Sequence, residues 1–144
     1  MTVYLDTCSL HRPLDDKTQV RIALESEAVL AILAMCEAGV ARLVSSETLQ
    51  FEVERNPHPQ RRAFVSEVLA GVTMKVELTD VIQKRAKALE ERGFKAIDSL
   101  HLASAEGGSV DYFSACDDRL LKKAKAQTDL RTIVLSPLWN LFRR

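Results

Sequence analysis

The sequence is poor in the residues and patterns that mark several classes of protein. It has only 5 glycines and 4 prolines among 144 residues, and 47% of its residues are apolar, which excludes a disordered or low-complexity chain. Its 20 basic and 20 acidic side chains cancel, so no overall charge attracts it to nucleic acid or to an anionic membrane. Any nucleic-acid binding must therefore depend on local groups of charge. The length predicts one domain over residues 1–144.

Cysteines and long apolar runs are scarce as well. Cys8, Cys36 and Cys116 are an odd number, are far apart and form no CxxC pair, which argues against a zinc site and favours reduced thiols. The apolar runs are too short to span a bilayer. The N-terminus has no basic segment followed by a long apolar run, so no signal peptide is expected. We therefore expect a cytoplasmic protein without a membrane partner.

Short apolar strands alternate with helical patterns along the whole chain. Apolar residues three or four positions apart predict helices, and brief apolar runs between them predict strands. Strands are expected at 2–5, 41–45, 72–78, 110–115 and 131–136, helices at 19–38, 46–55, 60–70, 79–91, 95–106, 118–126 and 137–142, and a polar loop at 12–19. Such alternation predicts an α/β protein in which a parallel sheet is covered by helices on both faces.

Four carboxylates stand at the ends or first turns of elements that are expected to be buried. Asp6 directly follows the first strand and Asp117 follows the fourth, while Glu52 and Asp98 lie in apolar stretches of helices. In open α/β sheets, ligands bind beyond the carboxyl ends of the strands. Clustered carboxylates repel one another unless a cation binds them, and Mg²⁺ and Mn²⁺ prefer oxygen ligands. Two such ions can support phosphodiester cleavage by activating water and stabilising the leaving oxygen.

Each of these acids also has a simpler interpretation. Asp98 and Asp117 could be helix caps or first-turn acids, which the helix dipole favours. Glu52 could be a solvated helix residue. Asp6 is the hardest to explain in this way, because the sequence predicts no helix directly after it. The metal-site interpretation therefore depends on the combination of the four acids.

Four segments resemble, in order, the acidic motifs of PIN-domain proteins, a family that includes the VapC-type toxins of bacterial toxin–antitoxin pairs. The segments are VYLDTCSLHRP, LVSSETLQFEVER, AIDSLHLASAE and YFSACDDRLLKKA, and the later TIVLSPLWNL is similar to the family's last strand. The resemblance implies a three-layer α/β/α sandwich, Rossmann-like in type, with a five-stranded parallel sheet. It also implies a metal-dependent ribonuclease.

The resemblance assigns roles to particular residues. By the matching motifs, the catalytic ligands of Mg²⁺ or Mn²⁺ would be Asp6, Glu52, Asp98 and Asp117. Thr7 matches the hydroxyl residue after the first aspartate, and Thr7 and Asp118 are expected to hold the ligands in position. Basic residues beside the motifs predict phosphate contacts from Arg12, Arg119 and Lys122, although a lysine-rich run also suits a solvated helix face. The partners implied are an RNA substrate, an antitoxin protein and a second copy in a homodimer.

Other functions stay open at this point. Ala115 stands where the family often has Thr or Ser, so the alternative is a PIN-fold RNA- or protein-binding module with weak or lost nuclease activity. A phosphatase of the haloacid dehalogenase type also begins with a strand that ends on Asp, but Cys8 occupies the place of its second Asp. His101 lies three residues after Asp98 and could be a metal ligand or a hydrogen-bonded core histidine.

Overall fold

The computed structural model describes residues 1–142, which form a five-stranded parallel sheet with helices on both sides. The strands are β1 (Thr2–Leu5), β2 (Arg42–Ser46), β3 (Met74–Val76), β4 (Tyr112–Ser114) and β5 (Ile133–Leu135), in the order β3-β2-β1-β4-β5. All four neighbouring pairs are parallel. Residues 143 and 144 of the expected domain lie outside the described residues.

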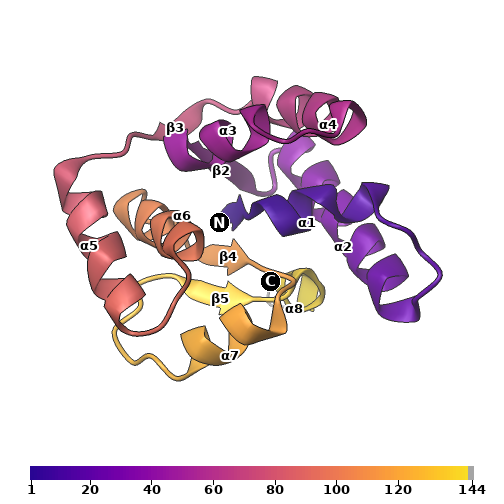
Figure 1. The fold of residues 1–144 in the computed structure, drawn as a ribbon. Coiled ribbons are helices and arrows are strands. Elements are labelled where there is room, and N and C mark those ends of the chain that lie inside the picture. Colours follow the sequence, from indigo (N-terminus) through magenta and orange to yellow (C-terminus); the bar gives the residue numbers. More distant parts are fainter. Residues whose placement is uncertain (143–144) are drawn as a thin grey trace.

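The helices lie on both sides of this sheet. They are α1 (Thr7–His11), the 3-10 helix η1 (Arg12–Leu14), α2 (Val20–Glu37), α3 (Glu47–Glu54), α4 (Pro59–Ala70), α5 (Asp80–Glu91), α6 (Ala96–Gly107), α7 (Asp118–Lys125) and α8 (Pro137–Phe142). Figure 1 shows α5 and α6 towards one side of the strands and α2 towards the other. Right-handed crossovers explain this division, because the chain moves from β1 to β3 in one direction and returns to β4 in the other. The predicted three-layer α/β/α fold is confirmed.

The core is built around the central strand β1. Tyr4 and Leu5 are fully buried, as is Phe113 in β4. The rings of Tyr4 and Phe113 are stacked with their centroids 5.2 Å apart. Burial from both faces of the sheet is the reason that these short strands contain consecutive apolar residues rather than an apolar–polar alternation.

The register of β1 and β4 aligns the ends of the two strands. Leu5 pairs with Ser114, and the backbone N–H of Asp6 donates to the carbonyl of Ser114 at 3.2 Å. The chain therefore leaves both strands at the same edge of the sheet. This alignment places the segments that carry Asp6 and Asp117 beside each other.

The expectation that no helix follows Asp6 is wrong. Helix α1 begins at Thr7, and the Oδ1 atom of Asp6 caps it by accepting from the backbone N–H of Ser9 at 2.9 Å. The fully buried Leu10 anchors this helix, which at five residues is too short to show a periodic pattern. The loop expected at 12–19 likewise begins with the turn η1, and β3, β4 and β5 are each three residues long, shorter than expected.

Within residues 1–142, none of the helices combines the length and the apolar character that a membrane crossing requires.

Candidate active site

The four acids lie around the carboxyl edge of the sheet. Asp6 follows β1, Asp117 follows β4, Glu52 is in α3, and Asp98 is in the first turn of α6. Burial raises the pKa of Asp6 to about 6, and the charge of Asp98 adds to this rise. Burial also raises the pKa of Asp98, and the charges of Asp117 and Glu52 add to it. Like charges act most strongly at short range, so Asp98 lies nearer to the other three acids than the sequence alone could show.

Glu52 is held by two hydrogen bonds from different elements. The hydroxyl of Thr7, at the start of α1, donates to Oε1 of Glu52, and Nε2 of His101 lies 2.9 Å from the same oxygen. Although burial alone would raise the pKa of Glu52, the hydrogen bonds from His101 and Thr7 lower it below its ordinary value. Glu52 is therefore kept ionised and fixed in orientation, and Thr7 has the positioning contact that the resemblance implies.

His101 belongs to a buried chain of hydrogen bonds that ends at Glu52. Its Nδ1 lies 2.6 Å from the hydroxyl of Tyr4, which lies 2.7 Å from Oγ of Ser46. A carboxylate can only accept, so Nε2 of His101 donates to Glu52, while Nδ1 is in hydrogen-bond contact with the hydroxyl of Tyr4. Burial raises the pKa of Tyr4 and keeps its hydroxyl protonated. Both ring nitrogens are thus engaged in hydrogen bonds. His101 therefore fits the alternative of a hydrogen-bonded core histidine and not that of a metal ligand.

Asp117 and Asp118 have different surroundings. Oδ1 of Asp117 accepts from the backbone N–H of Arg119 at 2.8 Å and so caps α7, as the simpler interpretation expects. Asp118 is exposed, and its carboxylate accepts two hydrogen bonds, at 2.7 and 2.8 Å, from the guanidinium of Arg21. This pairing lowers the pKa of Asp118. Any support that Asp118 gives to the site therefore passes through Arg21 and the backbone.

The donor set suits a hard divalent cation in its chemistry. All four predicted ligands are carboxylates, and the pKa values of Asp6 and Asp98 are raised chiefly by burial and further by neighbouring carboxylates, two costs that a bound cation would reduce. Among residues 1–142, however, no three His, Cys, Asp or Glu side chains are gathered as they would be around one ion. Asp6 and Asp117 each use Oδ1 to cap a helix. The type of ligand therefore fits a divalent cation, while the described side chains do not converge on one point.

Comparison with known proteins agrees with this arrangement. The family model described as PIN domain matches residues 3–126, which include all four acids. The chain belongs to the PIN domain family. PIN domains are generally nucleases. No curated protein sequence matches the chain.

Two solved structures share the fold of this PIN domain. FitAcB from Neisseria gonorrhoeae has a TM-score of 0.56 and 17% identity, with 94% of this chain and 97% of that chain covered. VapBC2 from Rickettsia felis, bound to a DNA fragment from their promoter, has a TM-score of 0.62 and 14% identity, with 94% and 98% covered. At these identities the likeness shows the fold alone.

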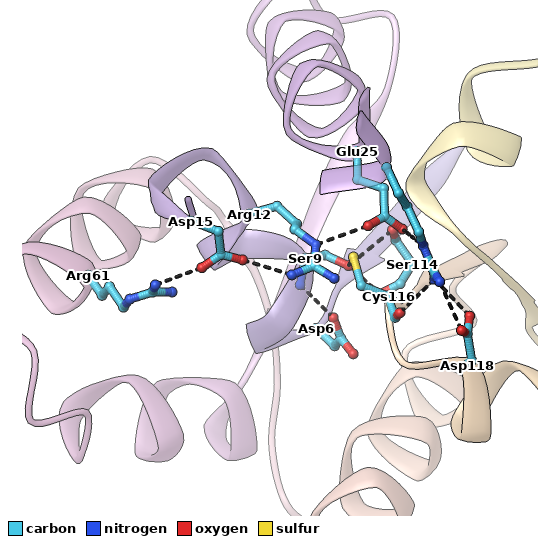
Figure 2. A network of polar contacts seen from close by, with 10 residues as sticks. Asp6, Ser9, Arg12, Asp15, Glu25, Arg61, Ser114, Cys116 and Asp118 are labelled. Atoms are coloured by element: carbon cyan, nitrogen blue, oxygen red, sulfur yellow. Dashed lines mark hydrogen bonds and ion pairs between the residues drawn. The ribbon is translucent and has the colours of Figure 1, made fainter. Parts of the chain in front are cut away.

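The basic residues expected to contact phosphate differ in their exposure to solvent and in their ion pairs. Arg119 and Lys122 are exposed on α7 of the PIN domain. Arg12 is paired with Asp15 at 2.8 Å and with the buried Glu25 at 3.1 Å, as Figure 2 shows. The charge of Arg12 is therefore used inside the protein, while phosphate contact by Arg119 and Lys122 stays a prediction.

Sequence reasoning missed Glu25, although a signal was present. Glu25 is only 1% exposed and lies on the face of α2 that also buries Ala28, Val29 and Ile32. An acid at the head of a helical apolar stripe indicates a buried ion pair, because an unpaired buried carboxylate is strongly unfavourable. The spacing alone could not name its partners, Arg12 and Arg21.

Without metal, Asp6→Asn is expected to stabilise the PIN domain more at neutral pH than at acid pH. The folded protein has a pKa of about 6 at Asp6, against an ordinary value of 3.8. Below pH 3.8 the side chain of Asp6 is protonated in both the folded and the unfolded state, so its burial costs no stability through ionisation. As the pH rises through 6, the folded state must ionise a buried acid and loses about 3 kcal/mol, at 1.36 kcal/mol per pKa unit.

This pH dependence is measurable by urea unfolding in EDTA from about pH 4 to about pH 7.5. The stability difference between Asp6→Asn and the wild type should grow up to about pH 6 and then level off, with Asp16→Asn, which replaces an exposed aspartate, as the control. A difference that stays constant with pH would contradict the assignment of a raised pKa to Asp6.

Proposed function

We propose that this PIN domain is a metal-dependent endoribonuclease that hydrolyses RNA phosphodiester bonds. The observation that supports the proposal is that carboxylates from four separate motifs lie around the carboxyl edge of the sheet, with Asp98 close enough to affect Asp6 and with Asp117 and Glu52 close enough to affect Asp98. A protein without a cation to bind gains nothing from such repulsion.

The proposed metal ligands are Asp6, Glu52, Asp98 and Asp117. When bound, Mg²⁺ or Mn²⁺ would supply an activated water and stabilise charge on the leaving oxygen. The chain's own groups prepare this chemistry in different ways. Asp6 and Asp98 supply buried negative charge that favours a cation. Glu52 stays ionised and fixed because Thr7 and His101 donate to it.

We further propose that the nuclease is the toxin of a toxin–antitoxin pair, a soluble cytoplasmic protein that acts as a homodimer and is held by an antitoxin. The family match and the shared fold with FitAcB and VapBC2 support this proposal. Exposed Arg119 and Lys122 on α7 are the proposed phosphate contacts, because neutralising phosphate charge supplies most of the sequence-independent affinity for nucleic acid.

The test is the cutting of a mixed set of labelled RNAs with Mn²⁺, with Mg²⁺ and with EDTA. We expect cutting with either metal, none in EDTA, and a rise of Tm with Mn²⁺, because a ligand that binds only the folded state stabilises it. Asp98→Asn should weaken both the cutting and the rise of Tm. Cutting that persists in EDTA, or equally in the variant, would reject the site. Binding of RNA without cutting under any metal would favour the binding module that Ala115 leaves open.

A further inference from the structure

A hollow adjoins the proposed site on the side of α3. It has a volume of about 470 Å³ and is lined by Thr7, Phe51, Glu52, Arg55, Asn56, Pro57, His58 and Ile97. Two of these residues, Thr7 and Glu52, belong to the proposed site, and Ile97 precedes the proposed ligand Asp98. When one group of a bound molecule lies at the acids, the next group of the same molecule can therefore occupy this hollow.

Phe51 and Arg55 lie one against the other in the lining of this hollow. The Phe51 side chain is exposed, with 53% of the residue accessible to solvent. The guanidinium carbon of Arg55, one helical turn later, lies 4.2 Å from the centroid of the Phe51 ring. Such a cation–π contact holds an exposed ring in one orientation. No carboxylate within residues 1–142 forms an ion pair with Arg55, so its charge remains available to a ligand.

We propose that this hollow is a nucleobase subsite, in which Phe51 and Arg55 stack a base next to the phosphate that lies at the acids. The proposal rests on the proposed nuclease function and adds a substrate requirement to it. Bases of a duplex are stacked on one another and cannot offer a free face, whereas single-stranded nucleic acid can. The subsite therefore selects single strands.

The polar groups of the hollow indicate how selective the subsite is. Oδ1 of Asn56 accepts from the backbone N–H of His58 at 2.9 Å, and Nδ2 of Asn56 lies 3.3 Å from Nε2 of His11. The amide of Asn56 is thus already bonded inside the protein. Stacking without hydrogen bonds to the base edges tolerates every base. We expect a strong preference for single strands and a weak preference among bases.

The first test measures binding of short labelled single-stranded RNA in EDTA, where no cutting interferes. Phe51→Ala should weaken binding about 5- to 150-fold, the range that corresponds to the loss of one stacked base. Trp139→Ala removes another exposed aromatic residue, on α8, and should leave the affinity unchanged. Weak binding of the matching RNA duplex should not depend on Phe51.

A second measurement reports contact directly. The chain has one tryptophan, so the double variant Phe51→Trp, Trp139→Phe has a single indole, placed in the proposed subsite. Its fluorescence should be quenched by single-stranded RNA and by single-stranded DNA, with wild-type affinity retained. Duplex should quench it weakly.

The outcomes separate this proposal from the nuclease proposal. If the wild type cuts RNA and Phe51→Ala binds single-stranded RNA as tightly as the wild type, the subsite is overturned and the nuclease proposal stands. If the wild type cuts no RNA but Phe51→Ala loses the binding of single-stranded RNA, the subsite is supported and the nuclease proposal is rejected. If Phe51→Ala changes the sedimentation of the protein but not its RNA affinity, the subsite is overturned and Phe51 is assigned to a contact with a second copy of the chain. Absence of single-strand binding by the wild type would also overturn it.

Discussion

Replacing Glu52 by glutamine is expected to reduce RNA cleavage about 100- to 1,000-fold while the protein stays folded. The glutamine side chain has nearly the same size, and its carbonyl oxygen can still accept from Thr7 or His101. What it lacks is the negative charge. The expected loss has the size measured when one preorganised group that stabilises transition-state charge is removed from an enzyme. Initial rates on one labelled RNA at fixed Mn²⁺, together with Tm, check the prediction.

A matched control lies on the same helix. Glu54 is exposed two residues later and accepts from the side chain of Gln50 at 3.2 Å, with no contact to the proposed ligands among its hydrogen bonds within residues 1–142. Glu54→Gln makes the same chemical change and should cut like the wild type. Equal rates for Glu52→Gln and Glu54→Gln would remove Glu52 from the site, and loss of both activities would indicate that the charge of the whole helix matters instead.

Signals that act within a few residues were sufficient to predict most of the fold. Oγ of Ser46 accepts from the backbone N–H of Leu49 at 3.0 Å, so a serine directly before the helical pattern caps α3. Thr79 caps α5 in the same way. Gly39, after α2, has a φ of +78°, a conformation that glycine adopts without strain. These local interactions, with the alternation of strands and helices, determine the parallel sheet.

The parts that sequence could not supply depend on contacts between distant elements. Arg12 stands beside the first motif and was expected to bind phosphate, but the fold places Glu25 of α2 against it. No spacing in the sequence encodes that pairing. The four acids were identified by motif order, and the sheet register then explains why the segments that carry Asp6 and Asp117 leave the sheet side by side. Helix α1 could not be predicted from the sequence either, because its five residues are too few to show a periodic pattern.

The ion-pair network in Figure 2 connects the segments that carry the acids. Arg21 of α2 donates to the carbonyl of Cys116 at 3.1 Å and to the carboxylate of Asp118, so it holds the residues on both sides of Asp117. Arg12 connects η1 to α2 through Glu25. Glu25 contacts both arginines, and we infer that its carboxylate keeps the segments after β1 and β4 in a fixed relation.

Replacing Glu25 by alanine is therefore expected to lower the free energy of unfolding by about 3–5 kcal/mol, the range found when one partner of a buried ion pair is removed. The carboxylate of Glu25 is 1% exposed and lies 3.1 Å from Arg12 and 3.5 Å from Arg21. Its loss leaves the largely buried guanidinium of Arg12 without its buried counter-charge and opens a cavity. The change is a large share of a typical domain's stability and corresponds to a fall in Tm on the order of 10 °C.

Urea unfolding with a shared m-value measures this loss, and Glu27→Ala provides the comparison. Glu27 is exposed on the same helix, so its replacement should change the stability by no more than about 0.5 kcal/mol. Glu25→Gln should fall between the two, because the amide fills the space and can accept from one arginine but removes the charge. If Glu25→Ala is as stable as Glu27→Ala, water must reach Arg12 and Arg21 well enough to replace the carboxylate. The network would then orient side chains without stabilising the segments around Asp6 and Asp117.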